Sequence, residues 1–170
     1  EYQTTLDDTI AYLRSEQETD GSWFGRWGTN YVYGTWSVLL GLEQTQVPRN
    51  DPMYTKAVKW LKSVQNSDGG WGEDNHSYHD DSTRGQAKSS TCFQTAWALL
   101  GLMAAGEVNS PEVKNGINYI LANQTEEGLW VDPGFTAPGF PKVFYLKYYG
   151  YDKFFPLWAL ARYRNELIKL

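Results

Sequence analysis

Aromatic side chains are the residues of this sequence whose type and grouping best suit chemistry. The 170 residues include eight tryptophans, twelve tyrosines and seven phenylalanines. Core packing explains some of them, but many fall in two connectors punctuated by glycine, 21–34 and 134–150. The face of an aromatic ring attracts a cation and offers no nucleophile. The two connectors are therefore the first place to look for a functional site.

A polar loop at 72–90 contains the other residues that could take part in chemistry. His76 and His79 lie three residues apart beside Asp80 and Asp81, a set that could be drawn as a metal site. A zinc site needs a further convincing ligand, which the loop does not offer. We interpret these histidines and aspartates as solvated surface residues, and we expect them to bind no metal.

Three other reactive residues have structural explanations. Glu73 and Asp74 are adjacent, and we interpret them as caps of a helix or loop rather than as a catalytic dyad. Cys92 is the single cysteine, which excludes an internal disulfide and a cysteine-rich metal site. We interpret it as a small buried residue near the start of a helix.

A glutamine and a tryptophan recur at a fixed spacing of six residues. Each pair follows a helical stretch that ends in glycine and polar residues. The glutamine amide can bond to backbone freed at the helix end while the indole packs over it. We therefore expect three structural clamps: Gln17 with Trp23, Gln65 with Trp71, and Gln124 with Trp130.

Two kinds of helix are expected to alternate along the chain, and each clamp follows a helix of the first kind. Amphipathic helices are expected at Thr4–Gln17, Met53–Gln65 and Pro111–Gln124, the last capped by Ser110 and begun by proline. Helices that are apolar nearly all round, and hence buried, are expected at 35–44, Phe93–Ala105 and Phe155–Ile168. Three copies of one template separated by 48 and 59 residues predict an all-α repeat protein.

Composition excludes some classes of function. Fifteen basic and twenty acidic residues give a net charge of −5, and no basic stripe is present, so nucleic acid is not an expected partner. No apolar run reaches the roughly 18 residues needed to cross a bilayer. The length fits one domain with a core of its own.

Longer segments add a family signature to the clamps. They read GSWFGRWGTNYVYGTW from residue 21, DGGWGED from 68, SSTCFQTAWALLGL from 89 and GFPKVFYLKYYGYDKFFPLWALARYR from 139. Together with the clamps they resemble the C-terminal quarter of squalene-hopene cyclases, and the resemblance covers essentially the whole chain.

The resemblance implies an architecture. Residues 1–170 would form the C-terminal part of a catalytic α/α-barrel domain, a partial toroid of helix hairpins with Gln-Trp motifs. A complete barrel needs about twelve helices, and this chain supplies about six. We therefore expect a chain truncated at its N-terminus, which begins inside a repeat. The resemblance also implies attachment to the cytoplasmic face of a membrane, a possible homodimer, and no metal or organic cofactor.

The resemblance further implies an isomerase that cyclises squalene. A strong acid protonates a terminal alkene, rings close in sequence, and aromatic faces stabilise the migrating carbocation where a carboxylate would trap it. Tyr33 matches a tyrosine that supports the acid. The residues that match aromatics of the substrate cavity are Trp27, Phe140, Phe144, Tyr148 and Tyr151.

The spacing of the last four aromatics is 4, 4 and 3 residues. If the stretch 140–151 is helical, they share one face. An aromatic stripe at helical spacing also suits ordinary core packing, which is the competing interpretation.

The family's acid is the middle aspartate of an Asp-x-Asp-Asp motif, which this sequence does not contain. Asp7–Asp8 and Asp80–Asp81 both lack the aspartate two residues ahead. We therefore expect the 170-residue chain to be inactive by itself.

Two other classes of protein remain open. A prenyltransferase-like α/α domain would need zinc held by Asp, Cys and His, and the lone Cys92 argues against it. A non-catalytic helical-repeat scaffold would use the connector aromatics to bind a protein or lipid.

Overall fold

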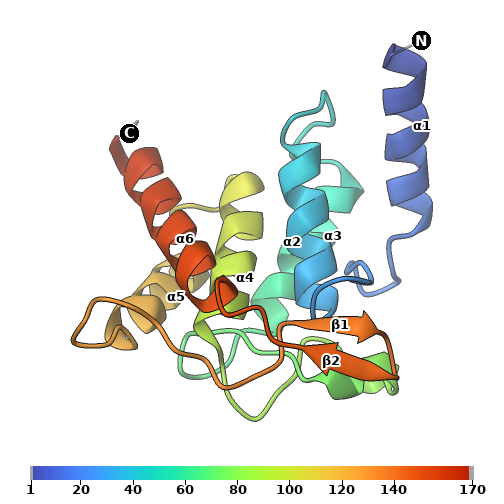
Figure 1. Ribbon diagram of the computed structural model, residues 1–170. Coiled ribbons are helices and arrows are strands. Elements are labelled where there is room, and N and C mark those ends of the chain that lie inside the picture. Colours follow the sequence, from blue (N-terminus) through green and yellow to red (C-terminus); the bar gives the residue numbers. More distant parts are fainter. Residues whose placement is uncertain (1, 169–170) are drawn as a thin grey trace.

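The computed structural model describes residues 2–168, which form six α-helices, two short 3-10 helices and one β-hairpin (Figure 1). The elements in chain order are α1 (Tyr2–Ser15), α2 (Tyr31–Leu42), α3 (Pro52–Ser63), η1 (Asn75–Tyr78), η2 (Asp81–Thr83), α4 (Cys92–Ala104), α5 (Pro111–Ala122), β1 (Ala137–Phe140), β2 (Phe144–Leu146) and α6 (Tyr151–Ile168). The predicted all-α class is confirmed. The prediction that Phe155–Ile168 is a buried helix is wrong, because only Asp152, Pro156 and Ala159 of α6 are buried and arginine, asparagine and glutamate interrupt its apolar sequence.

The core is centred on α4, whose thirteen residues are all buried. Its sequence is apolar nearly all round, so it has no face that favours water. It packs against α2, α5 and α6, and Figure 1 shows it between α2 and α6. Gly101 allows α2 close, because a Cβ there would lie 3.0 Å from the Cα of Trp36.

The outer helices are α1, α3 and α5. Asp51 accepts a hydrogen bond from the backbone N–H of Met53 and so caps α3. Ser110 caps α5 in the same way through Val113, as the sequence predicts. A proline occupies the first turn of both helices, where its missing N–H costs nothing. Helix α1 stands at one end of the molecule and buries no residue completely.

Each glutamine and tryptophan pair closes the loop that follows an outer helix. The indole N–H donates to a carbonyl in the last turn of that helix, at 2.7 Å, 2.7 Å and 2.9 Å for Trp23, Trp71 and Trp130. The glutamine amide donates to the glycine carbonyl of the loop instead, at 2.9 Å, 2.8 Å and 2.7 Å. The expected clamps are thus present, but the indole rather than the glutamine bonds to the freed helix carbonyl.

The connector 134–150 contains two strands and no helix. It forms an antiparallel hairpin in which Phe140 pairs with Phe144 and Ala137 with Leu146. Proline and glycine at 138, 139 and 141 disfavour a helix, because they remove donors and add backbone freedom. The condition under which Phe140, Phe144, Tyr148 and Tyr151 would share one helix face is therefore not met.

Within residues 2–168, no helix combines the length and the hydropathy that crossing a membrane would require.

The clamp geometry predicts a stability cost for Trp71→Phe. The substitution removes the donor to the carbonyl of Leu61 and leaves that buried group unpaired, which costs about 2 kcal/mol or more of unfolding free energy. Urea unfolding followed by circular dichroism measures the loss. Trp158→Phe is the matched control, because Trp158 is 43% exposed. Equal stability of the two variants would contradict the role of the clamp.

Candidate functional site

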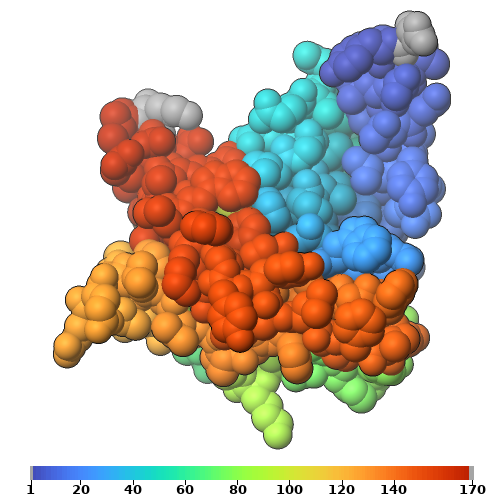
Figure 2. Space-filling model, viewed as in Figure 1, coloured from blue at the N-terminus to red at the C-terminus, as the bar shows by residue number. Residues whose placement is uncertain are grey.

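The connector 21–34 is held against the hairpin and the loop 72–90. The N–H of Thr29 donates to the carbonyl of Thr136 at 3.1 Å. The hydroxyl of Tyr78 donates to the carbonyls of Gly25 and Gly28 at 2.8 Å and 2.9 Å. Figure 2 shows the light-blue surface of this connector directly above the orange surface of the hairpin. The two aromatic connectors therefore form neighbouring parts of one region.

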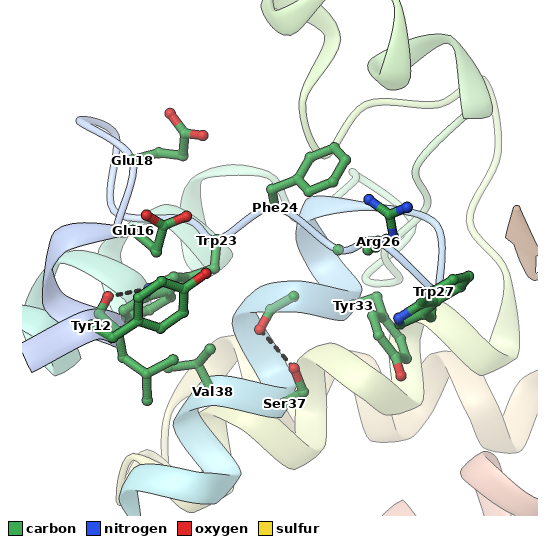
Figure 3. A pocket seen from close by; sticks show the side chains of 13 residues that line it. Tyr12, Glu16, Glu18, Trp23, Phe24, Arg26, Trp27, Tyr33, Ser37 and Val38 are labelled. Atoms are coloured by element: carbon green, nitrogen blue, oxygen red, sulfur yellow. Dashed lines mark hydrogen bonds between the residues drawn. The ribbon is translucent and has the colours of Figure 1, made fainter. Parts of the chain in front are cut away.

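Trp27 and Tyr33 line a pocket of about 350 Å³ (Figure 3). The pocket lies between the C-terminal end of α1 and the start of α2, and Trp23 and Phe24 contribute to its walls. Trp27 is 57% exposed, and the guanidinium of Arg26 lies 5.1 Å from its ring centre. The ring of Trp27 thus already contacts one cation and remains open to the pocket.

Trp97 on α4 is the centre of a cluster of rings. Its ring centre lies 5.0 Å from Tyr33, 5.9 Å from Tyr151 and 5.5 Å from Phe155. Trp97 is completely buried, whereas Tyr33 and Tyr151 are half-buried. It therefore fixes the distance between two tyrosines that come from α2 and α6.

The remaining predicted aromatics form two pairs. Tyr148 stacks on Tyr151 with ring centres 5.1 Å apart, which joins it to the cluster. Phe140 and Phe144 contact each other at 5.7 Å across the hairpin turn, and they are 56% and 45% exposed. The structure thus groups Tyr33, Tyr148 and Tyr151, while the phenylalanine pair lies apart on the hairpin. Neither Trp27 nor Phe140 is buried in interhelical packing.

Sequence reasoning missed five rings of this cluster. Each lies on an inner helix that the sequence analysis assigned only to the core. Their signal was a spacing of three or four residues from another aromatic, as in 33/36, 93/97 and 151/155/158. The missed rings are Trp36, Phe93, Trp97, Phe155 and Trp158.

Burial raises the pKa of two tyrosines of the site. It raises the pKa of Tyr33 above its ordinary value. It also raises the pKa of Tyr151, with smaller contributions from the phenols of Tyr33 and Tyr148. Neutral rings present electron-rich faces and hydroxyl donors but no anionic nucleophile.

Two buried carboxylates fix the starts of the inner helices. Glu73 accepts hydrogen bonds from the N–H groups of Asn30 at 3.0 Å and Val32 at 2.8 Å, at the start of α2. Asp132 accepts from the N–H of Cys92 at 2.9 Å and from that of Phe93 at 3.2 Å, at the start of α4. A carboxylate at a helix N-terminus is favourable. Both acids follow a clamp tryptophan by two residues.

The cap interpretation of Glu73 and Asp74 is confirmed, since Asp74 caps η1 through the N–H of His76. Asp132 was not singled out by sequence reasoning, although its position after Trp130 matches that of Glu73 after Trp71. Burial is the largest influence on both buried acids and raises the pKa of Glu73 and of Asp132, while the N–H donors oppose the shift.

Asp152 in the first turn of α6 extends this network. Its carboxylate accepts a hydrogen bond from the N–H of Asp132 at 3.3 Å. The ammonium of Lys147 donates to the carbonyl of Asp132. Asp152 and Lys147 therefore fasten the hairpin and α6 to the loop that caps α4, and Tyr148 and Tyr151 lie beside these two anchors.

The histidine loop does not assemble a metal site in the part of the chain that the structure describes. His76 and His79 stack with ring centres 6.2 Å apart. Asp80 caps η2 through Ser82, and Asp81 forms an ion pair with Arg84 at 3.0 Å. Both carboxylates thus have structural partners.

Comparisons with known proteins identify what the chain is similar to. Residues 1–165 match the family model of the squalene-hopene cyclase C-terminal domain. A squalene-hopene cyclase of Bradyrhizobium diazoefficiens is 60% identical over 158 residues, which are 93% of this chain and 24% of that protein. A dammaradiene synthase of Dryopteris crassirhizoma is 43% identical over 171 residues, covering 93% of this chain and 25% of that protein. The chain thus spans about a quarter of the length of these relatives.

A solved structure shares the fold. The type II terpene cyclase MstE from Scytonema superposes with a TM-score of 0.61 at 24% identity, covering 83% of this chain and 37% of that one. This likeness supports the helical architecture.

From the central position of Trp97 we predict that Trp97→Phe loosens the packing of the ring cluster and destabilises the fold. The smaller ring leaves a cavity among its partners and lowers the free energy of unfolding by about 1 to 3 kcal/mol. Near-ultraviolet circular dichroism, which reports on fixed aromatic rings, should weaken by more than the loss of one indole signal. Phe154→Leu is the control, because Phe154 is 71% exposed. An unchanged unfolding midpoint for Trp97→Phe would contradict the central position of this ring.

The buried phenol of Tyr31 predicts a loss of stability at alkaline pH. Burial raises its pKa to about 12, against about 10 in an unfolded chain. The folded protein holds the phenol proton more tightly than the unfolded chain does. The free energy of unfolding therefore keeps its full value below pH about 10 and decreases as the pH rises toward 12. Urea unfolding at several pH values measures the decline, which should be shallower in Tyr31→Phe. An identical pH dependence in both proteins would show that another group is responsible.

Proposed function

The chain belongs to the squalene-hopene cyclase C-terminal domain family, and from that membership we propose that it supplies the aromatic wall of a triterpene cyclase acting on squalene. In this proposal Trp27, Phe140, Phe144, Tyr148 and Tyr151 face the substrate. Tyr33 supports the acid that starts the reaction. The glutamine and tryptophan clamps have a structural role only.

The reaction requires an apolar wall without nucleophiles. A proton added to a terminal alkene creates a carbocation, and ring closures move the charge along the chain until a proton is lost. Aromatic faces lower the energy of each cation by electrostatic attraction and cannot add to it. Burial raises the pKa of Tyr33 and Tyr151, so these residues present ring faces and no anionic oxygen.

One observation carries the proposal: the connector aromatics are exposed although the loops that hold them are firmly anchored. Trp27, Phe140 and Tyr148 are 57%, 56% and 47% exposed. The anchors are the buried carboxylates Glu73 and Asp132. Exposed rings on anchored backbone form a surface prepared to receive an apolar partner.

The proton donor has to come from elsewhere than these 170 residues. The sequence contains no Asp-x-Asp-Asp motif, so the chain alone has no group matching the family's acid. We therefore propose that the chain alone does not cyclise squalene. We also propose that the active protein is attached peripherally to the cytoplasmic face of a membrane, where squalene would be available.

A chimera tests the proposed function. The part of the Bradyrhizobium diazoefficiens cyclase that precedes the matched region is joined to this chain in place of the relative's own C-terminal quarter. Incubation with squalene and mass spectrometry of the products should detect cyclised triterpene from the chimera and none from the 170-residue chain. A folded but inactive chimera beside an active parent enzyme would contradict the proposal.

In the same chimera, Trp27→Ala should lower the rate of cyclisation roughly thirtyfold, because a desolvated cation–π contact contributes about 2 kcal/mol. The control is Tyr2→Ala, whose side chain is 82% exposed on α1. An unchanged rate in Trp27→Ala would remove this ring from the proposed wall.

A further inference from the structure

Tyr148 lies in a short segment without helix or strand, between the end of β2 at Leu146 and the start of α6 at Tyr151. Its side chain is 47% exposed, and its ring stacks on that of Tyr151 with ring centres 5.1 Å apart. Loop segments are more mobile than the helices and strands that they connect. A loop ring therefore keeps a fixed position when its backbone is bonded to a fixed part of the molecule.

Thr136 supplies such a bond to Tyr148. Its hydroxyl oxygen accepts a hydrogen bond from the backbone N–H of Tyr148 at 2.8 Å. The same hydroxyl donates to the carbonyl of Leu146 at 3.4 Å, and the backbone N–H of Thr136 donates to that carbonyl at 2.9 Å. Thr136 is 1% exposed, so water hardly competes for these bonds. The residue thus fastens the backbone of the loop just before and at Tyr148.

Thr136 is held in turn by the connector 21–34. Its carbonyl accepts a hydrogen bond from the N–H of Thr29 at 3.1 Å. The carbonyl of Thr29 accepts one from the side-chain amide of Gln94 at 3.1 Å, and Gln94 is a buried residue of α4. A series of hydrogen bonds therefore leads from α4, through Thr29 and Thr136, to the backbone of Tyr148.

The second tyrosine of the stack has contacts of its own with the core. The ring of Tyr151 lies 5.9 Å from Trp97 and 5.0 Å from Phe155. Its backbone N–H donates to the carbonyl of Tyr148 at 3.0 Å. The backbone bond to Thr136 and the stack on Tyr151 thus hold Tyr148 from two sides.

We propose that Thr136 is a positioning residue of the cyclisation, which acts by holding the ring of Tyr148 at its place in the aromatic wall. This role rests on the proposed function, in which Tyr148 faces the substrate. Thr136 itself is buried and bonds to backbone, so it acts through the tyrosine and not by touching the hydrocarbon.

The product is expected to depend on this bond, because the attraction between a cation and a ring needs the two to lie within about 6 Å of each other. A carbocation whose ring has moved away is less stabilised. It then loses a proton from a neighbouring carbon to water before the remaining rings close, and the electrons of the broken C–H bond form an alkene. A displaced Tyr148 should therefore give products with fewer rings.

Hydrogen exchange in the 170-residue chain tests the bond itself. Thr136→Val keeps nearly the same side-chain shape and removes the hydroxyl. The exchange rate of the Tyr148 amide, measured by NMR on isotope-labelled protein, should rise about tenfold, as expected for the loss of one ordinary hydrogen bond. Thr136→Ser retains a hydroxyl and should exchange nearly as slowly as the unaltered chain. Unchanged exchange in Thr136→Val, or equally fast exchange in both variants, would overturn the proposal.

The products of the chimera described above test the effect on the reaction. Thr136→Val should raise the share of products with fewer rings severalfold, and Thr136→Ser should retain the original pattern. Thr95→Val is the matched control, because Thr95 is completely buried and its hydroxyl accepts a hydrogen bond from the N–H of the clamp residue Trp71 at 2.9 Å. This control should lower the free energy of unfolding and leave the product pattern unchanged.

The possible outcomes separate the two proposals. An active chimera whose product pattern is unaltered by Thr136→Val, or is altered as much by Thr95→Val, would overturn the positioning role. A chimera without any product would contradict the proposed function instead. The exchange rate of the Tyr148 amide would then decide by itself whether Thr136 holds Tyr148.

Discussion

The hydrogen bond from a clamp indole to a carbonyl ten residues earlier is the interaction on which the rest of the structure depends. It recurs at Trp23, Trp71 and Trp130 with nearly the same length. Each bond satisfies a carbonyl that the end of an outer helix leaves free and buries a large ring at the same point. The chain therefore leaves every outer helix along a defined path, which sets where the next segment begins.

The carboxylates that follow the clamps fix the positions of the inner helices. Glu73 and Asp132 each lie two residues after a clamp tryptophan and bond to the N-terminus of the preceding inner helix. Neighbouring repeats are thus joined by charge-assisted hydrogen bonds in a buried setting, where such bonds are strong. The connector 21–34 runs into the start of α2, and the connector 134–150 begins two residues after Asp132. A rigid backbone therefore supports the exposed rings.

The rings themselves divide into two groups. Trp97 and its buried neighbours contribute packing between α2, α4 and α6. Trp27, Phe140 and Phe144 contribute little to that core and remain open. The proposed wall depends on both groups, because the open rings can only hold a fixed geometry if their neighbours are immobile.

The sequence by itself determined the helices, the Ser110 cap and the three clamps, because helix periodicity, capping residues and glycine exits act over a few neighbouring residues. It also indicated that Glu73 would cap. Only the tertiary structure decided that 137–146 forms a hairpin, that Trp97 unites tyrosines from α2 and α6, and that Asp132 reaches the start of α4. The contacts of Trp97 and Asp132 join residues 39 or more positions apart. The hairpin depends on whether helix or strand prevails in 137–146, which the surrounding structure decides. Spacing along the chain can mark such residues, but it does not identify their distant partners, since these are set by how the helices pack.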